Sequence, residues 1–276
     1  MHNDHTSTNE LLTFTRELAF EAGQLIRSMR ENGELDHRYK QGIEIVTSAD
    51  LASDDLLCSR IQERFPDHQI LSEERPPDVD LSAENIEHLW VIDPIDGTVN
   101  YSLNHAMAAV SIAYFHHYRA QVGVVYNPFM DECFFATRGQ GAFINERPIS
   151  VEPIDSLNRA VIATGFPYQR DQRPPLTAML RDVLQQVADV RRIGAAALDI
   201  CSVACGRLHA YYENVSPWDM AAAQLIAREA GAVVDYYDDE EKDKPLELRS
   251  RHFMVSSPGI AAEFRQLLQR SWSASR

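Results

Sequence analysis

Residues 90–101 read WVIDPIDGTVNY, in which an apolar run stops abruptly at two carboxylates and a Gly-Thr turn. The side chains of Leu89–Ile92 are all apolar, which predicts a short buried strand. Asp93, Asp96 and Thr98 follow the carboxyl end of that strand, where open α/β sheets usually place their functional groups. Two acids three residues apart are suited to share hard divalent cations, since Mg²⁺ prefers oxygen ligands and is commonly held by a few carboxylates and a phosphate. The stretch therefore predicts half of a phosphate-handling site.

A turn alone does not define a site, because Asp, Pro, Gly and Thr are ordinary turn formers. Acids at the edge of an apolar segment recur, however, in three other places: VTSAD at 46–50, LSEE at 71–74 and PWD at 217–219. A metal cluster assembled from several loops requires this arrangement. We therefore expect these acids to converge in space.

The charge balance limits the classes of partner. The chain has 26 Lys and Arg against 41 Asp and Glu, a net charge of −15. Nucleic acid is not expected as a partner, since its phosphates are bound by clustered Lys and Arg. Carboxylates also repel a phosphate substrate, because two like charges about 4 Å apart cost roughly 4 kcal/mol at an effective dielectric of about 20. Bound cations remove this conflict, and for that reason we expect an obligatory metal.

The order of predicted elements indicates two lobes in a chain of 276 residues. A helix with a capping box at Ser7–Glu10 and a second helix over 48–65 precede segments typical of antiparallel strands. In the second half, short strands alternate with helical stretches, which indicates an α/β sheet. We expect an N-terminal α+β lobe at residues 1–153, carrying most of the metal ligands, and a C-terminal α/β lobe at 154–276, contributing Asp219 and substrate contacts.

Two local patterns have a plain structural explanation. Asp50 is predicted in the first turn of the second helix, where an acid is often only a favourable partner for the helix dipole. Arg138–Gly141 has the glycines of a nucleotide-binding loop. No helix is predicted after it and the next segment is typical of a strand, so that interpretation is rejected.

The sequence predicts a cytoplasmic protein without membrane contact. Residues 1–10 are polar and lack the apolar core of a secretion signal. The most apolar run, Ala106–Phe115, is too short to cross a bilayer. The four cysteines are scattered and form no C-x-x-C pair, which predicts reduced thiols in the core.

Two signatures resemble the inositol monophosphatase family, the Mg²⁺-dependent, lithium-sensitive phosphomonoesterases. They are D-P-I-D-G-T-x-N-Y at 93–101 and W-D-x-A-A at Trp218–Ala222. Further matches follow in the same order along the chain: Val46–Asp50, Glu73–Glu74, Thr164–Tyr168 and Gly194–Asp199. The resemblance covers the chain from Leu11 to about Ala262. It implies a layered αβαβα sandwich of the α+β and α/β type, with a mainly antiparallel sheet in the N-terminal half and a mixed or parallel one in the C-terminal half. It also implies a homodimer.

The resemblance also implies a set of metal ligands. Glu73, Asp93 and the Ile95 carbonyl would hold a first Mg²⁺, and Asp93, Asp96 and Asp219 a second. A third, more weakly bound ion would be held by Glu73, which would also help to position the attacking water. Two to three Mg²⁺ ions are therefore expected.

The remaining implied roles concern the water and the phosphate. Thr98, hydrogen-bonded to Asp50, would orient or deprotonate the water. The backbone N–H groups of Gly97 and Thr98 would bind the phosphate oxygens. Lys40 would add positive charge nearby, although a solvated surface role explains a single Lys almost as well.

For the alcohol half of the substrate, the resemblance points to Asp96, Gly194, Ala196 and Glu213. Carboxylates and backbone groups bind vicinal hydroxyls well, because each hydroxyl both donates and accepts. The loop from Glu213 to Asp219 is one residue shorter than in the family pattern, with Asn214-Val215 in place of a glycine. This departure puts the reach of Glu213, and with it the preference for inositol, in question.

Three hypotheses remain open on the sequence. The first is a phosphomonoesterase acting on inositol monophosphate or a similar polyol phosphate. The second keeps the reaction and changes the substrate to histidinol phosphate, a sugar bisphosphate or a nucleotide 3′-phosphate. The third is a regulatory binding module without turnover, against which the complete acidic set argues.

Overall fold

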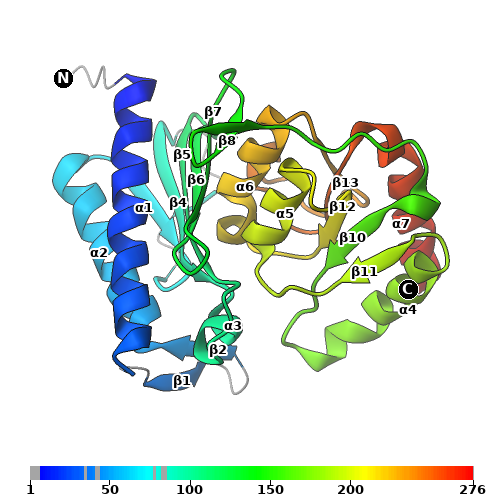
Figure 1. Cartoon of the computed structure of the whole chain (residues 1–276), viewed down its shortest axis with the longest axis horizontal. Coiled ribbons are helices and arrows are strands. Elements are labelled where there is room, and N and C mark those ends of the chain that lie inside the picture. The colour runs from blue at the N-terminus through cyan, green and yellow to red at the C-terminus, as the bar shows by residue number, and fades with distance from the viewer. Residues whose placement is uncertain (1–6, 34–35, 41–43, 77–78, 82–85, 276) are drawn as a thin grey trace.

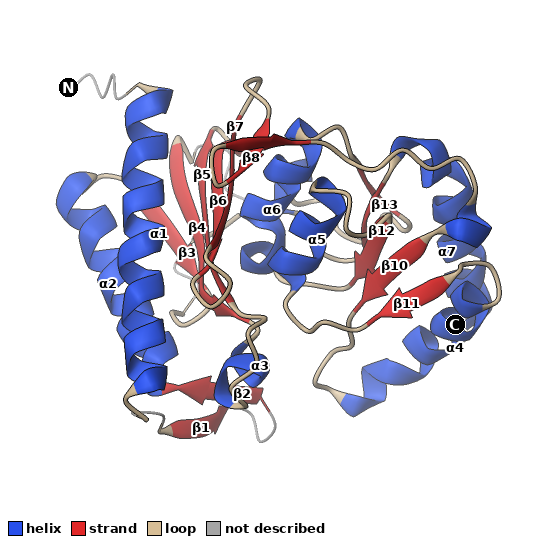
Figure 2. Ribbon diagram, in the orientation of Figure 1, coloured by secondary structure: helices blue, strands red, loops and turns tan. Residues whose placement is uncertain are grey.

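The computed structural model describes residues 7–33, 36–40, 44–76, 79–81 and 86–275. It has five layers, in the order helix, sheet, helix, sheet, helix (Figures 1 and 2). The first helical layer consists of α1 (Thr8–Glu31) and α2 (Ser48–Arg64), and the central one of α5 (Ala196–Ala204) and α6 (Pro217–Glu229). The last consists of α4 (Arg173–Leu184) and α7 (Ala261–Ser275). The αβαβα sandwich predicted from the sequence is confirmed.

The first sheet has seven strands in the order β3-β4-β5-β6-β7-β8-β9, and only β3 and β4 run parallel. Its strands are β3 (Gln69–Ser72), β4 (His88–Asp96), β5 (Ala109–His116), β6 (Arg119–Asn127), β7 (Glu132–Thr137), β8 (Ala142–Ile144) and β9 (Arg147–Ile149). A separate small hairpin is formed by β1 (His37–Lys40) and β2 (Glu44–Thr47). The predicted antiparallel character of the N-terminal half is therefore confirmed.

The second sheet is mixed, with the order β11-β10-β12-β14-β13. Its strands are β10 (Val161–Thr164), β11 (Asp189–Arg191), β12 (Ala210–Glu213), β13 (Val233–Tyr236) and β14 (Phe253–Ser256). The pairs β10·β11 and β10·β12 are parallel, whereas β12·β14 and β13·β14 are antiparallel. This arrangement agrees with the mixed α/β half expected from the sequence.

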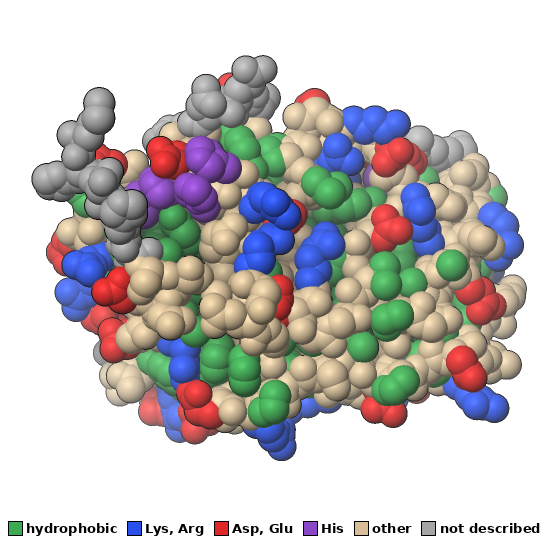
Figure 3. Space-filling view, turned by 90° about the horizontal axis from the view of Figure 1, so that it is seen from above, with side chains coloured by type: hydrophobic (Ala, Val, Ile, Leu, Met, Phe, Trp, Pro, Cys, Tyr) green, Lys and Arg blue, Asp and Glu red, His purple; other side chains and the backbone are tan. Residues whose placement is uncertain are grey.

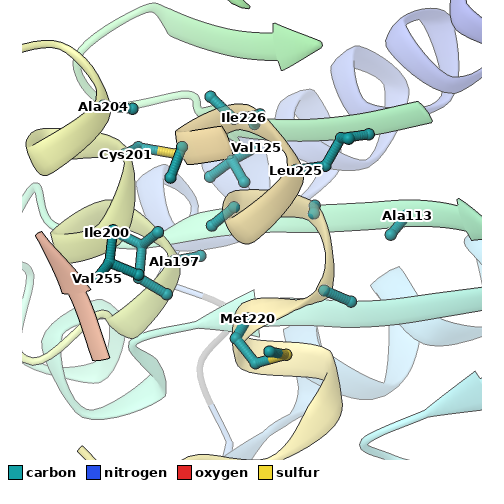
Figure 4. Close-up of a cluster of buried hydrophobic side chains, with 14 of the residues drawn as sticks. Ala113, Val125, Ala197, Ile200, Cys201, Ala204, Met220, Leu225, Ile226 and Val255 are labelled. Atoms are coloured by element: carbon teal, nitrogen blue, oxygen red, sulfur yellow. The ribbon is translucent and has the colours of Figure 1, made fainter. Parts of the chain in front are cut away.

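Apolar side chains fill the space between the layers. One core joins α5 and α6 to both sheets, and Figure 4 shows Ile226 of α6 beside Val125 of β6. A second core lies under α1 and α2, and a third under α4 and α7. Although α5 and α6 belong to the second half of the sequence, α6 packs directly on β5 and β6 of the first sheet. This packing brings the start of α6 to the end of β4.

Strand β4 is longer than predicted. It runs from His88 to Asp96, and its register against β5 shifts between Asp93, opposite Ser111, and Asp96, opposite Ala109. Three residue steps on β4 therefore face two on β5, as in a β-bulge. Because side chains alternate across a sheet, residues three apart normally point to opposite faces. The extra residue restores Asp93 and Asp96 to the same face, toward the central helices.

The central layer needs a glycine on β6. A Cβ at Gly123 would lie 2.7 Å from the Ala222 carbonyl oxygen and 3.1 Å from its Cα. Both contacts are to backbone, so no side chain can move aside. We expect Gly123→Ala to lower the free energy of unfolding by about 1–3 kcal/mol, as overpacking does. Gln121→Ala on the same strand should change it by no more than about 0.5 kcal/mol. Equal urea midpoints for the two variants would contradict the close approach of α6.

Local features agree with several sequence predictions. Ser7 and Glu10 form the predicted capping box of α1, and Arg138–Gly141 joins two strands instead of opening a helix. All four cysteines are free, with Cys205 only partly buried. Among the described residues, none of the helices has the length and apolarity needed to cross a bilayer.

Candidate active site

Three carboxylates from distant parts of the sequence meet at the end of β4. Asp93 and Asp96 come from the bulged end of the strand, and Asp219 from the first turn of α6. One oxygen of each lies within 4.8 Å of the others. Asp93 and Asp96 are almost fully buried, with 1% and 5% of their surface exposed. The expected convergence of these acids is present in the structure.

The start of α6 fixes the position of Asp219. Pro217 occupies the first helical turn, where its missing N–H leaves no bond unmade. Asp219 is the third helical residue and closes a capping box, accepting the Ser216 N–H at 2.7 Å. One carboxylate oxygen is thus held by the backbone, which orients the side chain toward Asp93 and Asp96.

Asp96 links β4 to the central helix α5. Its two oxygens accept the backbone N–H groups of Ala196 at 3.0 Å and Ala197 at 2.8 Å. Both donors lie in the first turn of α5, whose unpaired amides favour a negative charge. The side chain therefore positions Ala196 next to the acids. Asp93 is oriented more locally, by the Ile95 N–H at 3.0 Å.

Thr98 and Asp50 form a hydrogen-bonded pair beside the acids. The Thr98 hydroxyl lies 3.0 Å from Asp50 Oδ1 and 3.1 Å from the Ile95 carbonyl oxygen, and both of these are acceptors. Asp50 is held in turn by the N–H and hydroxyl of Thr47, at 2.8 and 2.5 Å. Because its proton is donated to these acceptors, the Thr98 oxygen keeps lone pairs that can accept from a water.

Gly97 makes the turn between β4 and the short helix α3 (Thr98–Ser102). Its φ is +88°, in the left-handed region that favours glycine. A Cβ there would lie 2.8 Å from the Met107 carbonyl oxygen and 3.2 Å from that of Gly194. A larger residue is therefore excluded both by conformation and by space.

Glu73 brings a fourth carboxylate, from the loop after β3. Its N–H donates to the Ile92 carbonyl at 3.4 Å, which ties the loop to β4. The Glu73 side chain is hydrogen-bonded to that of Asp93. Two carboxyl groups can form such a bond only when they share a proton. The adjacent Glu74 does not line the cleft around these acids.

Burial and mutual repulsion perturb the acids strongly. Burial, followed by the charges of Glu73, Asp96 and Asp219, holds the pKa of Asp93 well above its usual range. Burial raises the pKa of Asp96 to about 7 against the opposing effect of its two amide donors. Burial and the charge of Asp96 raise the pKa of Asp219 to about 8. In the metal-free protein these side chains therefore hold protons that ordinary carboxyl groups have lost.

This predicts an unusual pH dependence for the metal-free protein. The folded state binds protons on Asp96 and Asp219 up to pH 7 to 8, whereas the unfolded chain releases them near pH 4. Raising the pH through that window therefore favours the unfolded state. We expect the melting temperature in EDTA to fall from pH 5 to pH 8, and saturating Mg²⁺ to reverse the fall. A melting temperature in EDTA that rises over this window would contradict the assignment.

The donor set fits a hard divalent cation. The groups available are carboxylate oxygens and the Ile95 carbonyl, the ligands that Mg²⁺ prefers. Within the described part of the chain, no Lys or Arg side chain is ion-paired with Asp93, Asp96 or Asp219. Burying several acids together without a cation costs free energy, and the raised pKa values reflect that cost. A bound dication would relieve it.

The acids open into a cleft of about 310 Å³ between the two sheets. The residues predicted to contact substrate, Gly194, Ala196 and Glu213, line this cleft together with Asp96. The shortened loop after Glu213 does not carry that side chain out of the cleft. Its carboxylate accepts the Tyr211 hydroxyl at 2.6 Å, and burial raises its pKa to about 7. Asp50, by contrast, is hydrogen-bonded to Thr98 and does not line the cleft.

A close approach at Gly165 accommodates Glu213. A Cβ at Gly165 would lie 2.0 Å from one Glu213 carboxylate oxygen. Gly165 belongs to the TGFPY segment that the sequence comparison with the family singled out. The physical reason for a glycine there is therefore the space that it leaves for the carboxylate.

Other cleft residues were missed by the sequence analysis. Arg192 and Arg251 line the cleft and are cations, and Tyr168 and Trp218 add aromatic surface. An added Cβ at Gly194 would lie 2.4 Å from the Arg192 guanidinium, so that group lies directly over the turn. Arg192 stands two residues before Gly194, and this proximity was the available signal. The side chain of Lys40 lies outside what the structure describes.

Comparison with known proteins agrees with this geometry. The model of the "Inositol monophosphatase family" matches residues 7–273. A "Nus factor SuhB" from Pasteurella multocida is 37% identical over 264 residues, covering 95% of this chain and 96% of the relative. An "Inositol-1-monophosphatase" from Synechocystis sp. is 39% identical over 230 residues, covering 82% of this chain and 77% of the relative.

The fold agrees as well. The solved structure of an inositol monophosphatase from Anabaena (Nostoc) sp. superposes with a TM-score of 0.82 at 34% identity, covering 96% of this chain and 98% of that one. Sequence and fold thus match over nearly the whole length. The chain therefore belongs to the inositol monophosphatase family.

Proposed function

We propose that the protein hydrolyses a small phosphomonoester with Mg²⁺, and that inositol monophosphate is its substrate. The observation that carries this proposal is the convergence of Asp93, Asp96 and Asp219 on one buried point, next to the Thr98–Asp50 pair. Acids alone would repel a phosphate, whereas acids holding cations attract one. Family membership supports the same reaction class.

Each acid has a proposed part in holding two to three ions. Glu73, Asp93 and the Ile95 carbonyl hold the first, Asp93, Asp96 and Asp219 hold the second, and Glu73 supports a weaker third. When bound, Mg²⁺ neutralises the phosphate charge and lowers the pKa of water. Asp93 is shared between the two main sets, so its removal should be the most damaging.

The other side chains handle the water and the ester. The Thr98 oxygen accepts a hydrogen bond from the water through its lone pairs. Asp50 orients the Thr98 hydroxyl for this role, and Glu73 positions the water from the other side. The N–H groups of Gly97 and Thr98 bind phosphate oxygens. Phosphoryl transfer needs in-line placement and charge neutralisation more than covalent catalysis. The arrangement offers both without a protein nucleophile.

The alcohol half is proposed to contact Asp96, Glu213 and the backbone at Gly194 and Ala196. Carboxylates and amides around a polar cleft favour a ligand with several hydroxyl groups. Arg192 and Arg251 at the same cleft would favour a second anionic group, as in a sugar bisphosphate or a nucleotide 3′-phosphate. Histidinol phosphate fits less well, because a positively charged amine would meet those guanidinium groups.

A phosphate-release screen tests the proposal. Purified protein with saturating Mg²⁺ is given inositol monophosphates, histidinol phosphate, sugar bisphosphates and nucleotide 3′-phosphates, each with an EDTA control. We expect metal-dependent release, fastest with inositol monophosphate, and inhibition by lithium. Release from no ester would favour the contrasting hypothesis of a regulatory binding module, in keeping with a 37% identical relative named as a Nus factor.

Gly165→Ala and Glu213→Gln should have the same effect on the substrate. The first pushes the carboxylate away and the second removes its charge. We expect each to raise KM for inositol monophosphate about tenfold, with a smaller change in kcat, since both remove a contact distant from the phosphate. The matched control is steady-state kinetics on a phosphate ester whose leaving group carries no hydroxyl groups. If both variants lost kcat equally on both esters, Glu213 would not be a substrate contact.

We also propose a homodimer that acts in the cytoplasm without binding nucleic acid or membrane. The net charge of −15 supports the last two points. Analytical ultracentrifugation at micromolar concentration tests the dimer, and a single species of monomer mass would refute it.

A further inference from the structure

A second cluster of side chains that could bind a metal lies on the first sheet, at the opposite end of β4 from the acids. It consists of Glu87 and His88 at the start of β4, His116 at the end of β5, and His117 in the following turn. We call these four residues the histidine cluster. Figure 3 shows histidines gathered beside an acidic side chain on one exposed face. None of these residues takes part in the proposed phosphatase reaction.

Three residues of the histidine cluster bring ligand atoms close together. One atom each from Glu87, His116 and His117 lies within 4.8 Å of the other two. Glu87 Oε1 is 3.9 Å from His116 Nε2 and 3.7 Å from His88 Nε2. These separations are too long for hydrogen bonds. Zn²⁺ ligated at about 2.0–2.1 Å in a tetrahedron holds its ligand atoms roughly 3.4 Å apart, and the two Glu87 distances are close to that separation.

The sheet itself preorganises the cluster. His88 pairs with His116 in the β4·β5 register, and the next step joins the His117 N–H to the Glu87 carbonyl at 2.9 Å. The side chains of Glu87 and His117 are therefore brought together by backbone bonds and not by their own attraction. Sites built on strands are held more precisely than sites on free loops.

A supporting hydrogen bond orients one imidazole. His88 Nδ1 lies 2.6 Å from the Tyr114 hydroxyl, which directs the opposite nitrogen, Nε2, toward Glu87. Metal-binding histidines commonly have their second nitrogen fixed in this way. Ring stacking adds further order, since the centroids of His88 and His116 are 5.3 Å apart and those of His116 and His117 4.3 Å.

The turn that carries His117 has a disfavoured backbone conformation. His117 and Tyr118 both have positive φ, +48° and +59°, in a two-residue connection between β5 and β6. Such a turn is normally made by Asn-Gly or a similar pair. Histidine in the left-handed region is disfavoured, and strained residues concentrate at functional sites.

We propose that the histidine cluster binds a borderline divalent transition-metal ion of the Zn²⁺ class, separately from the Mg²⁺ of the acidic cleft. Imidazole nitrogens with one carboxylate suit Zn²⁺, Cu²⁺ or Ni²⁺, whereas the all-oxygen cleft suits Mg²⁺. The two clusters therefore differ in the class of ion that they select.

Zinc alone is the probe. Full-length protein in saturating Mg²⁺, which occupies the acidic cleft, is titrated with Zn²⁺ against a chromophoric chelator, and with Co²⁺ to record its d–d absorption. We expect one Zn²⁺ per chain and a tetrahedral Co²⁺ spectrum. His116→Asn/His117→Asn and Glu87→Gln should each weaken Zn²⁺ binding at least about tenfold, as loss of a ligand does.

His105→Asn, which changes an exposed histidine elsewhere on the surface, is the matched control and should bind Zn²⁺ as the parent does. Mg²⁺-dependent phosphate release should be unchanged in the cluster variants, which reports that they are folded. Equal Zn²⁺ affinity in the parent and the double variant, or no Zn²⁺ retained by the parent, would overturn the proposal. Neither outcome depends on whether the acidic cleft is catalytic.

Discussion

Asp93→Asn is expected to reduce Mg²⁺-dependent phosphate release by about a thousandfold, or roughly 4 kcal/mol of transition-state stabilisation. Asp93 is the side chain shared by both proposed ligand sets and lies between Glu73 and Asp219. Asparagine keeps the size and the Ile95 hydrogen bond but supplies no negative charge. The variant should therefore keep its fold but bind Mg²⁺ too weakly to support the reaction. Initial rates over a Mg²⁺ titration measure the effect.

The same change should stabilise the metal-free protein. Four acids crowd together without a cation, so neutralising one relieves repulsion and removes the need to hold a proton. We expect a higher melting temperature than the parent in EDTA and a smaller rise on adding Mg²⁺. Asp243→Asn removes an exposed acid that does not line the cleft and should do neither. A purely structural Asp93 would give the opposite result, a variant that melts earlier in EDTA.

Thr98→Val should reduce kcat by about 10²–10³-fold, the range typical of lost acid–base or water positioning. Valine has the shape of threonine but cannot bond to Asp50 or to the Ile95 carbonyl, 3.0 and 3.1 Å away. The Mg²⁺ concentration for half-maximal rate should change little, because the carboxylates remain. Stopped-time assays at saturating substrate and Mg²⁺ give kcat directly.

Three further variants separate positioning from packing. Thr98→Ser keeps the hydroxyl and should retain most of the activity. Asp50→Asn should impair kcat, and the Thr98→Val/Asp50→Asn double variant should be little worse than either single variant, since the two residues act as one unit. Additive losses would show that Asp50 does not work through Thr98. Full activity of Thr98→Val would remove the hydroxyl from the reaction altogether.

The sequence predicted the cleft's acids because their signals are local. Asp93 and Asp96 end an apolar run, and Asp219 opens a helix after Pro217, so both positions could be recognised from neighbouring residues. Their convergence was expected because acids recur at the edges of several apolar segments, and the family resemblance supported that expectation. The bulge that turns Asp93 and Asp96 to one face escaped prediction, because it depends on the register with β5, which no residue of β4 alone determines.

The two arginines of the cleft could not be predicted from the sequence, for a different reason. Arg192 and Arg251 lie on separate strand ends, and nothing in their immediate sequence distinguishes them from solvated surface arginines. Only the pairing of β10 with β11 and of β12 with β14 brings these strand ends to the acids. Whether Glu213 reaches the cleft could not be decided from the sequence for a related reason. Its position is set by β12 and the space at Gly165, and the loop length after it has little influence.

The histidine cluster shows the same dependence on register. His116 and His117 are adjacent in sequence, and no acid stands near them along the chain. The partner, Glu87, is supplied by the neighbouring strand thirty residues earlier, through the pairing of His88 with His116. Cross-strand neighbours of this kind cannot be found by spacing along one segment.

Anomalous diffraction from a crystal soaked in Mn²⁺ tests the central claim most directly, because Mn²⁺ replaces Mg²⁺ at oxygen sites and can be located without prior phases. The account predicts a strong peak bonded to carboxylate oxygens of Asp93, Asp96 and Asp219, and a second peak shared by Asp93 with Glu73. A crystal that contains Mn²⁺ elsewhere but has no peak among these four side chains would contradict it.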